Sequence, residues 1–142
     1  MYIYGIIATP DDNGSVMITC PLLPEVTSFA ERDDVAKIKH HASHAINEAV
    51  AARIKAFDDI PLPNHDEGLA VRLDTQLSLK ASLVMALRQN KMNRAALSRI
   101  SGKHRHHIDR LFNPNISASL KSYDEIFALF DKMADTTYHA AS

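Results

Sequence analysis

The spacing of hydrophobic positions divides the chain into a first half with strand-like segments and a second half that is helical. Residues 2–8 (YIYGIIA) and 15–20 (SVMITC) are rich in aromatic and β-branched side chains, and residues 10–14 between them have turn chemistry. This arrangement predicts a β-hairpin. Residues 21–24 (PLLP) end the hairpin, and residues 26–30 predict a short third strand.

A long amphipathic helix is predicted over residues 35–57, with Asp33 or Asp34 as its N-cap. Its apolar positions form one broad stripe that could cover a face of a small sheet: Val35, Ile38, Ala42, Ala45, Ile46, Ala49, Val50 and Phe57. A loop over residues 58–68 leads to residues 69–73 (LAVRL), which alternate as a strand does. Residues 1–74 are therefore expected to form a β-β-β-α-β domain of the α+β class.

Helical periodicity continues from residue 75 onward, so residues 75–142 are expected to form a second, all-α domain. A first helix ends near Asn90, and a last helix starts at Ser122, with Glu125 completing a capping box. Between them, residues 93–111 (NRAALSRISGKHRHHIDRL) predict two short helices joined by a turn that contains glycine. This is typical of a helix-turn-helix, whose second helix lies in a DNA major groove.

The two halves carry net charges of opposite sign. Residues 1–74 contain 6 Lys and Arg against 12 Asp and Glu, a net −6, whereas residues 75–142 contain 10 against 5, a net +5. A basic half can hold phosphates, and an acidic half repels nucleic acid but suits a basic protein. The split indicates two different partners; two merely solvated surfaces are the alternative interpretation.

Three features follow one another along roughly residues 1–134. A hairpin leads into the PLLP segment at 21–24, a long helix ends in IPLP at 60–63, and a helical block keeps the spacing of helix-turn-helix proteins at Leu73, Lys80, Ala95, Leu97, Arg99, Asp109, Arg110 and Leu111. In this order they resemble HicB-type antitoxins of bacterial HicAB toxin–antitoxin systems. The chain departs from that family at Leu22 and Glu25, where Asp and Gly are frequent. It departs from helix-turn-helix motifs generally at Ser101 and Lys103, where apolar residues are more usual.

The resemblance implies a partial ribonuclease-H-like fold for residues 1–74, followed by a helix-turn-helix DNA-binding domain. The first domain would bind and neutralise a HicA-type toxin, a small basic ribonuclease that cleaves mRNA. The second would bind operator DNA and repress the protein's own operon. Such a protein is not an enzyme and needs no cofactor. Because a helix-turn-helix reads symmetric half-sites, at least a dimer is expected, as a homodimer or homotetramer.

The expected DNA contacts lie in and beside the second short helix, where basic side chains can reach base edges and Arg can bond guanine. The residues are Arg94, Lys103, His104, Arg105, His107 and Arg110. Lys91 and Arg99 are expected to contact phosphates, which position the protein without reading sequence, and Arg94 suits that role as well. A solvated basic helix is the alternative interpretation.

Other polar clusters favour structural roles. His40, His44 and Glu48 share a helix face, as zinc ligands can. A zinc site also needs a ligand from another part of the chain and an enclosed pocket, and the sequence indicates neither, so no metal is expected. Two-metal nucleases hold carboxylates on rigid strands, whereas the pairs Asp11–Asp12 and Asp33–Asp34 fall in a turn and at a helix start, so catalysis is not expected. Cys20 ends an apolar strand and is expected in the core.

The sequence has no run of ~18 apolar residues and no basic-then-apolar start, so neither a membrane span nor a signal peptide is expected. A single cysteine fits a reducing cytoplasm. Two other classes stay open. A ligand-sensing helix-turn-helix transcription regulator without a toxin partner would need a pocket between sheet and helix. An enzyme would need a convergent set of titratable groups, which we do not find.

Overall fold

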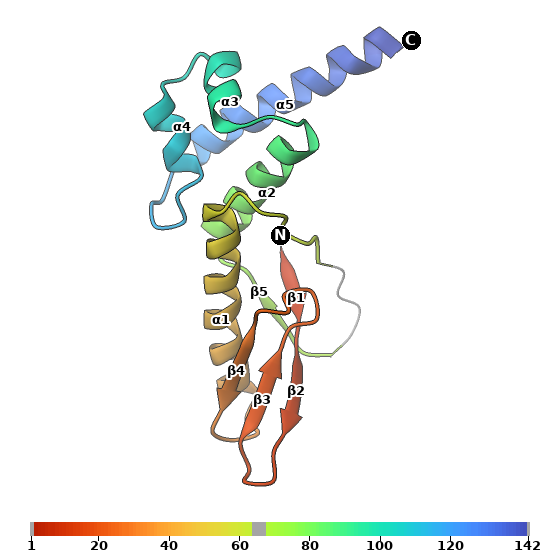
Figure 1. Cartoon of the computed structure of the whole chain (residues 1–142), viewed down its shortest axis with the longest axis vertical. Coiled ribbons are helices and arrows are strands. Elements are labelled where there is room, and N and C mark those ends of the chain that lie inside the picture. The colour runs from red at the N-terminus through yellow and green to blue at the C-terminus, as the bar shows by residue number, and fades with distance from the viewer. Residues whose placement is uncertain (1, 64–67, 142) are drawn as a thin grey trace.

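The computed structural model describes residues 2–63 and 68–141, with side chains as far as residue 135. It has the expected α+β composition, with antiparallel strands in the first half and helices in the second (Figure 1). One sheet pairs β1 (Ile3–Gly5) with β5 (Ala70–Arg72), and the other has the order β2 (Ile7–Pro10), β3 (Val16–Thr19), β4 (Thr27–Ala30). Of the loop expected over 58–68, residues 64–67 lie outside the described residues.

The segment YIYGIIA forms two strands rather than the single strand that its pattern predicts. Its first part pairs with β5 and its second part pairs with β3, in an antiparallel register that places Ile7 opposite Thr19. The change of partner falls at Ile6, whose N–H donates to the Leu69 carbonyl at 2.9 Å. Hydrophobicity is continuous across Ile6, so the pattern of apolar residues does not predict that the chain moves from one sheet to the other.

Helix α1 (Val35–Lys55) packs along one face of the strands, as expected. Asp34 is its N-cap, and its carboxylate accepts from the N–H groups of Ala36 at 2.9 Å and Lys37 at 3.3 Å. The packed stripe consists of Ile38, Ala42, Ile46, Val50 and Ile54, all buried. Val35 was expected in this stripe but is 55% exposed, because the helix meets the sheet only one turn later.

A polar clamp joins the segment after the hairpin to the end of α1. The Arg53 guanidinium donates from Nε to Glu25 Oε2 at 2.6 Å and from Nη2 to Oε1 at 2.8 Å, and its third nitrogen donates to the Asp59 carbonyl. This bidentate geometry is the strong form of the Arg–carboxylate pair and holds the pKa of the Glu25 carboxyl below its usual value. The clamp explains why a charged residue is accommodated at position 25.

The second half contains α2 (Thr75–Gln89), α3 (Arg94–Ser101), α4 (Arg105–Leu111) and α5 (Leu120–Ala141). The last helix begins two residues earlier than the capping box predicts. Ser119 provides the cap, since its hydroxyl accepts from the Ser122 N–H at 3.2 Å. Glu125 does not close a capping box with Ser122; it forms an ion pair with Lys103 instead. The C-terminal part of α5 projects away from the rest of the molecule (Figure 1).

The two halves share one hydrophobic core across the expected boundary at residue 74. Buried side chains of α1 and α2 belong to the same cluster as Ile60, whose N–H lies 3.3 Å from Met85 Sδ. Arg88 of α2 donates to the Phe57 carbonyl at 2.9 Å, and Asn47 of α1 accepts from the Asp74 N–H at 3.1 Å. None of the helices in the described part of the chain is both long and apolar enough to cross a membrane.

Candidate nucleic-acid interface

Helices α3 and α4 are joined by a short turn centred on glycine. Gly102 follows the last residue of α3 with φ 71°, a left-handed conformation that favours glycine, and its N–H donates to the Ser98 carbonyl. The Asn93 side chain caps α3 through the Ala96 N–H at 2.8 Å. His104 caps α4, because its Nδ1 accepts from the His106 N–H at 3.3 Å. Both helix starts and the turn are therefore fixed by local hydrogen bonds.

The turn uses serine hydroxyls where an apolar residue would be more usual. Ser98 donates to the Lys103 carbonyl at 2.6 Å, and Ser101 accepts from the Lys103 N–H at 3.2 Å. The interior of the pair is still apolar, since Leu97, Ile108 and Leu111 are all fully buried. At positions 101 and 103, where helix-turn-helix motifs usually have apolar residues, hydrogen bonds within the turn thus take the place of apolar packing.

Four of the basic residues expected to contact DNA are engaged within the molecule. Arg105 Nε donates to Asp109 Oδ1 at 3.0 Å, and Arg94 approaches the same oxygen at 3.6 Å. Lys103 is paired with Glu125 of α5, and His104 is the cap of α4. The Arg–Asp pairs are exposed and weak, so they leave the guanidinium groups available to another anion. Lys103 is the least accessible of these cations, with 29% of its side chain exposed.

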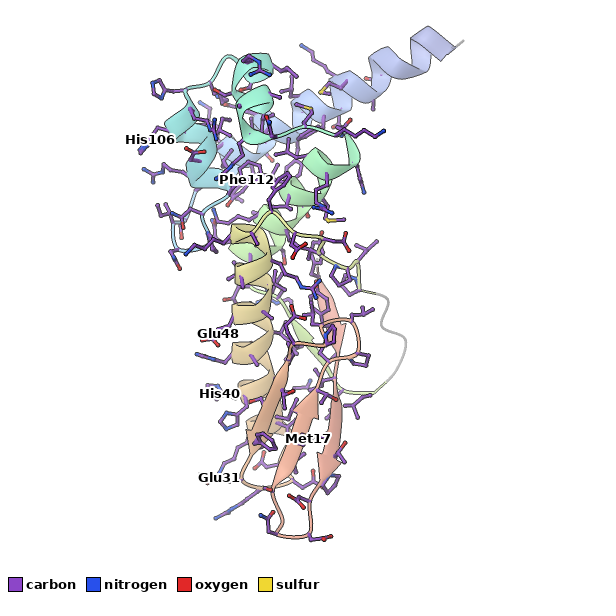
Figure 2. The ribbon with its side chains drawn as sticks, viewed as in Figure 1. Met17, Glu31, His40, Glu48, His106 and Phe112 are labelled. Atoms are coloured by element: carbon purple, nitrogen blue, oxygen red, sulfur yellow. The ribbon has the colours of Figure 1, made fainter. Side chains whose placement is uncertain are left out.

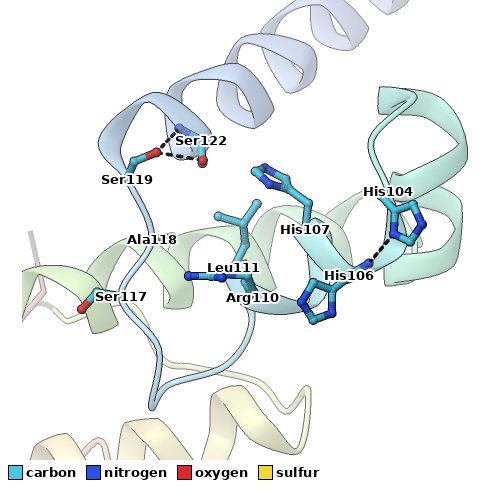
Figure 3. Close-up of a pocket in the computed structure, with 9 residues that line it drawn as sticks. All are labelled: His104, His106, His107, Arg110, Leu111, Ser117, Ala118, Ser119 and Ser122. Atoms are coloured by element: carbon cyan, nitrogen blue, oxygen red, sulfur yellow. Dashed lines mark hydrogen bonds between the residues drawn. The ribbon is translucent and has the colours of Figure 1, made fainter.

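The exposed arc of α4 contains a residue that we did not include among the DNA contacts. Successive residues of a helix are rotated by about 100°, so His106 lies between Arg105 and Arg110 on the side opposite the buried Ile108. His106 is exposed and points away from the core (Figure 2). His107, which was included, instead faces the start of α5 (Figure 3). The helical rotation could have revealed this difference, because it needs only the positions of the buried Ile108 and Leu111.

The positive charge of the second half is concentrated in this helix pair. Residues 91–112 contain six Lys and Arg and one acidic residue, Asp109, a net +5, so the remaining residues of the half are together neutral. Lys91 and Arg99, the expected phosphate contacts, are both exposed, Lys91 in the turn before α3 and Arg99 in the last turn of α3. A basic surface of this kind attracts the phosphates of a duplex irrespective of base sequence.

A cavity of about 450 Å³ lies beside α4, between that helix and the start of α5 (Figure 3). Its lining comprises His104, His106, His107, Arg110, Leu111, Ser117, Ala118, Ser119 and Ser122. Every ionisable side chain in this lining is a histidine or an arginine. His107 Nε2 is shielded from solvent and has no hydrogen-bond partner among the described residues.

A buried lysine of α2 ties α4 to the rest of the domain. Lys80 is 0% exposed, and its Nζ donates to the carbonyls of Arg110 at 3.0 Å and Leu111 at 3.4 Å, at the C-terminal end of α4. The ammonium also lies 5.5 Å from the ring centre of Tyr123 in α5. Burial, with a smaller effect of the Arg110 guanidinium, lowers the pKa of Lys80 to about 8. The sequence placed Lys80 in the second half but gave no indication of this role.

A second surface, on the first half, is apolar. On the face of β2, β3 and β4 that points away from α1, Thr9, Met17 and Phe29 stand opposite one another. Phe29 is 59% exposed and the neighbouring Ile7 is 52% exposed. Since β2 and β4 run in the same direction, the residues that follow them gather at one end of the sheet, and five of these are exposed carboxylates: Asp11, Asp12, Glu31, Asp33 and Asp34. Figure 2 shows Glu31 at this end.

The histidine and carboxylate clusters noted in the sequence do not make a metal centre. Among the described residues, no group of three His, Cys, Asp or Glu is arranged to hold an ion. His44 and Glu48 lie 3.6 Å apart on the exposed side of α1, and His40 lies on the same side of that helix. Cys20 is buried as expected, and burial raises the pKa of its thiol. A raised thiol pKa is the opposite of what a nucleophilic cysteine requires.

Comparison with known proteins does not assign the chain to a family. No protein-family model matches it, and no curated protein matches it.

Proposed function

We propose that this protein is a HicB-type antitoxin that represses its own operon through α3 and α4 and neutralises a HicA-type toxin through its N-terminal half. In this proposal α3 and α4 are a helix-turn-helix, and residues 1–74 are a partial ribonuclease-H-like domain. The observation that carries it is the α3–α4 pair itself, a glycine turn between short capped helices with an exposed basic arc on the second. The protein acts by binding and has no catalytic step.

The DNA-binding role is supported by where the charge lies. Arg105, His106 and Arg110 occupy the outward side of α4, from which a recognition helix reaches base edges in the major groove. Lys91, in the turn before α3, and Arg99, in the last turn of α3, are exposed and would contact the DNA backbone. Symmetric half-sites require a homodimer or tetramer, and the projecting α5 and the strand edges are the surfaces available for pairing.

The toxin-binding role is supported by the exposed face of β2, β3 and β4. Its apolar side chains are accompanied by five carboxylates at one end, and residues 1–74 carry a net −6. A toxin that cleaves RNA needs a basic surface, so an acidic, partly apolar face complements it in charge. A ligand-sensing regulator is less well supported, because the space between sheet and α1 is filled by Ile38, Ala42 and Ile46.

The DNA half of the proposal is tested by band-shift titration with the DNA upstream of the protein's own gene, at two salt concentrations. Arg105→Ala should weaken binding by ~1–3 kcal/mol and relax the preference at one base pair. Lys91→Ala should weaken binding to all sequences equally and reduce the salt dependence. If neither substitution changes the affinity, α3 and α4 do not bind DNA.

The proposal predicts a short reading frame for a small basic protein beside the gene, and the toxin half is tested by co-expression with its product. A small basic protein should co-purify with the full chain, and its toxicity should be lost in its presence. The purified chain alone should leave RNA and DNA intact in magnesium or manganese. Cleavage that disappears when Asp11 and Asp12 are both changed to Asn would replace the antitoxin assignment by a nuclease.

A further inference from the structure

The cavity between α4 and the start of α5 is built for an anion. Arg110 and His107 of α4 line it from one side, and Ser119, the cap of α5, and Ser122 in its first turn line it from the other (Figure 3). At about 450 Å³ it has room for a phosphate group together with water molecules. We propose that it is a phosphate-binding site, and that the phosphate is one of the DNA backbone beside the recognition helix. This assignment of the ligand rests on the proposed function.

The donors in the cavity are of the kind that phosphate oxygens require. Arg110 presents a guanidinium, which binds phosphate with two parallel hydrogen bonds. His107 also lines the cavity, its Nε2 has no partner among the described residues, and an imidazole N–H can donate one hydrogen bond. The hydroxyls of Ser119 and Ser122 lie 2.9 Å apart, so one bonds to the other and the remaining proton can point to a ligand.

The start of α5 adds a backbone donor to these side chains. Among the described residues, the N–H group of Leu120, the first residue of α5, finds no hydrogen-bond acceptor, whereas that of Ser122 bonds to Ser119. Free N–H groups in the first turn of a 22-residue helix carry partial positive charge. They complement the cationic lining formed by α4.

Negative charge near the cavity is already compensated. None of the described residues that line it is acidic. Glu125, one turn further along α5, is an acidic residue near the cavity, but its carboxylate is paired with Lys103. An entering phosphate therefore meets donors and a compensated carboxylate rather than a free one.

Both walls of the cavity are held in place from α2. The Gln76 side chain donates to the Ala118 carbonyl at 2.8 Å, accepts from the Ala118 N–H at 3.2 Å and accepts from the Tyr123 hydroxyl at 2.6 Å. One turn later Lys80 holds the carbonyls of Arg110 and Leu111. Because α2 fixes the start of α5 and the end of α4 together, the site is preorganised before any ligand arrives.

The location of the cavity favours a DNA phosphate as the ligand. Arg110 belongs both to the outward arc of α4 and to the cavity lining, and His106 does so as well. A helix lying in the major groove has a phosphate strand on each side, and contacts to those strands set its depth and orientation. The cavity lies on one side of α4, and Arg94 of α3 lies on the other, paired with Asp109.

The test measures binding of two probes, inorganic phosphate by calorimetry and a random-sequence DNA duplex by fluorescence anisotropy over a range of salt. The variants are Arg110→Gln and Ser122→Ala, and the control is Lys121→Gln, an equal loss of charge outside the lining. Arg110→Gln should weaken duplex binding about tenfold and lower the salt slope by about 1, whereas Lys121→Gln should leave both nearly unchanged.

The outcomes separate the site from the proposed function. Duplex binding that is unaffected by Arg110→Gln and Ser122→Ala would overturn the phosphate site while leaving DNA binding in place. If the wild-type chain binds no duplex but binds inorganic phosphate, and Arg110→Gln abolishes that binding, then the cavity is a phosphate site for a small ligand and the DNA-binding function is wrong. Equal losses for Arg110→Gln and Lys121→Gln would reduce the effect to general charge and overturn the site.

Discussion

A single lysine shows how much one residue can contribute to the position of a helix. Lys80 is fully buried, and its partners are two main-chain carbonyls and an aromatic ring rather than a carboxylate. The carbonyls at the end of a helix need donors, and α4 is too short to be stable without tertiary contacts. Lys80 supplies the donors and at the same time fixes α4 against α2.

Replacing Lys80 by methionine should therefore destabilise the protein. Lys80→Met keeps most of the aliphatic volume but leaves the Leu111 carbonyl without its donor, which costs ~1–3 kcal/mol for a buried group. Urea unfolding of the full chain measures the change, and Lys39→Met on the exposed side of α1 is the matched control. Equal midpoints for Lys80→Met and the wild type would show that the carbonyls do not depend on Lys80.

The same lysine predicts how stability changes at alkaline pH. Burial lowers the pKa of Lys80 from 10.5 to about 8, so between these values the unfolded chain binds more protons than the folded chain. The free energy of unfolding should then rise with pH above 8, by up to about 3 kcal/mol for the whole shift. Burial raises the pKa of Tyr123 to about 12, and its contribution is lost as the pH rises from 10. Burial also raises the pKa of Cys20, whose contribution is lost as the pH rises from 9. The effect of Lys80 is therefore measured as the difference in stability between the wild type and Lys80→Met, which should grow between pH 8 and 10. In Lys80→Met, the rise between pH 8 and 10 should be absent.

At the scale of elements, the sequence predicted what depends on local chemistry. The bounds of α1, its Asp34 cap and the break after α4 at Asn113-Pro114 agree with the structure to within a few residues. Two features were not predicted. The strand changes its partner at Ile6, and α5 is capped by Ser119 rather than Ser122. Both depend on contacts with distant parts of the chain, Leu69 for the first and Gln76 of α2 for the second.

The candidate DNA-binding surface likewise has some features that local sequence predicts and others that depend on tertiary contacts. A basic helix pair with a glycine turn was evident from residues 93–111, because caps and turns are local. The pairing of Lys103 with Glu125 was not evident, and neither was the shielding of His107 Nε2. Both depend on how the last helix packs against α4. The cavity beside α4 was missed for the same reason, as its walls come from segments that only tertiary packing brings together.

The turn between α3 and α4 should be sensitive to loss of its glycine. Gly102 has φ 71°, and among the described residues no atom beyond its two chain neighbours lies within 4 Å of where a Cβ would be, so Gly102→Ala introduces backbone strain without a clash. The expected cost is ~1–2 kcal/mol, together with weaker DNA binding because the angle between the helices changes. Gly14→Ala, with φ 86° in the β2–β3 turn and equally open surroundings, is the control. It should lower the melting temperature in the same way, yet leave DNA affinity unchanged.

At the scale of the whole molecule, two surfaces of opposite character are joined through one core. Residues 1–74 carry a net −6 and residues 91–112 a net +5. If the two charged surfaces lay close together, they would attract each other; if they lie far apart, each can attract a separate partner. The acidic end of the β2–β3–β4 sheet is at the far end of the molecule from α4 (Figure 1). At that distance salt screens the two charges from each other, so each surface is free to bind its own partner.

Changes on the sheet face should therefore affect the protein partner without affecting DNA. Phe29→Lys and Met17→Lys each place a cation on the apolar face, where it would repel a basic toxin and lose apolar contact area. Leu62→Lys is the matched control, because Leu62 is 78% exposed and lies outside this face. Neutralisation is measured as cell survival on co-expression with the toxin, and DNA affinity is measured by fluorescence anisotropy with the operator. We expect the two sheet variants to lose neutralisation and to keep operator binding, whereas Leu62→Lys should keep both. If both sheet variants fold and still neutralise the toxin, a different surface binds it, and the exposed apolar face needs another occupant.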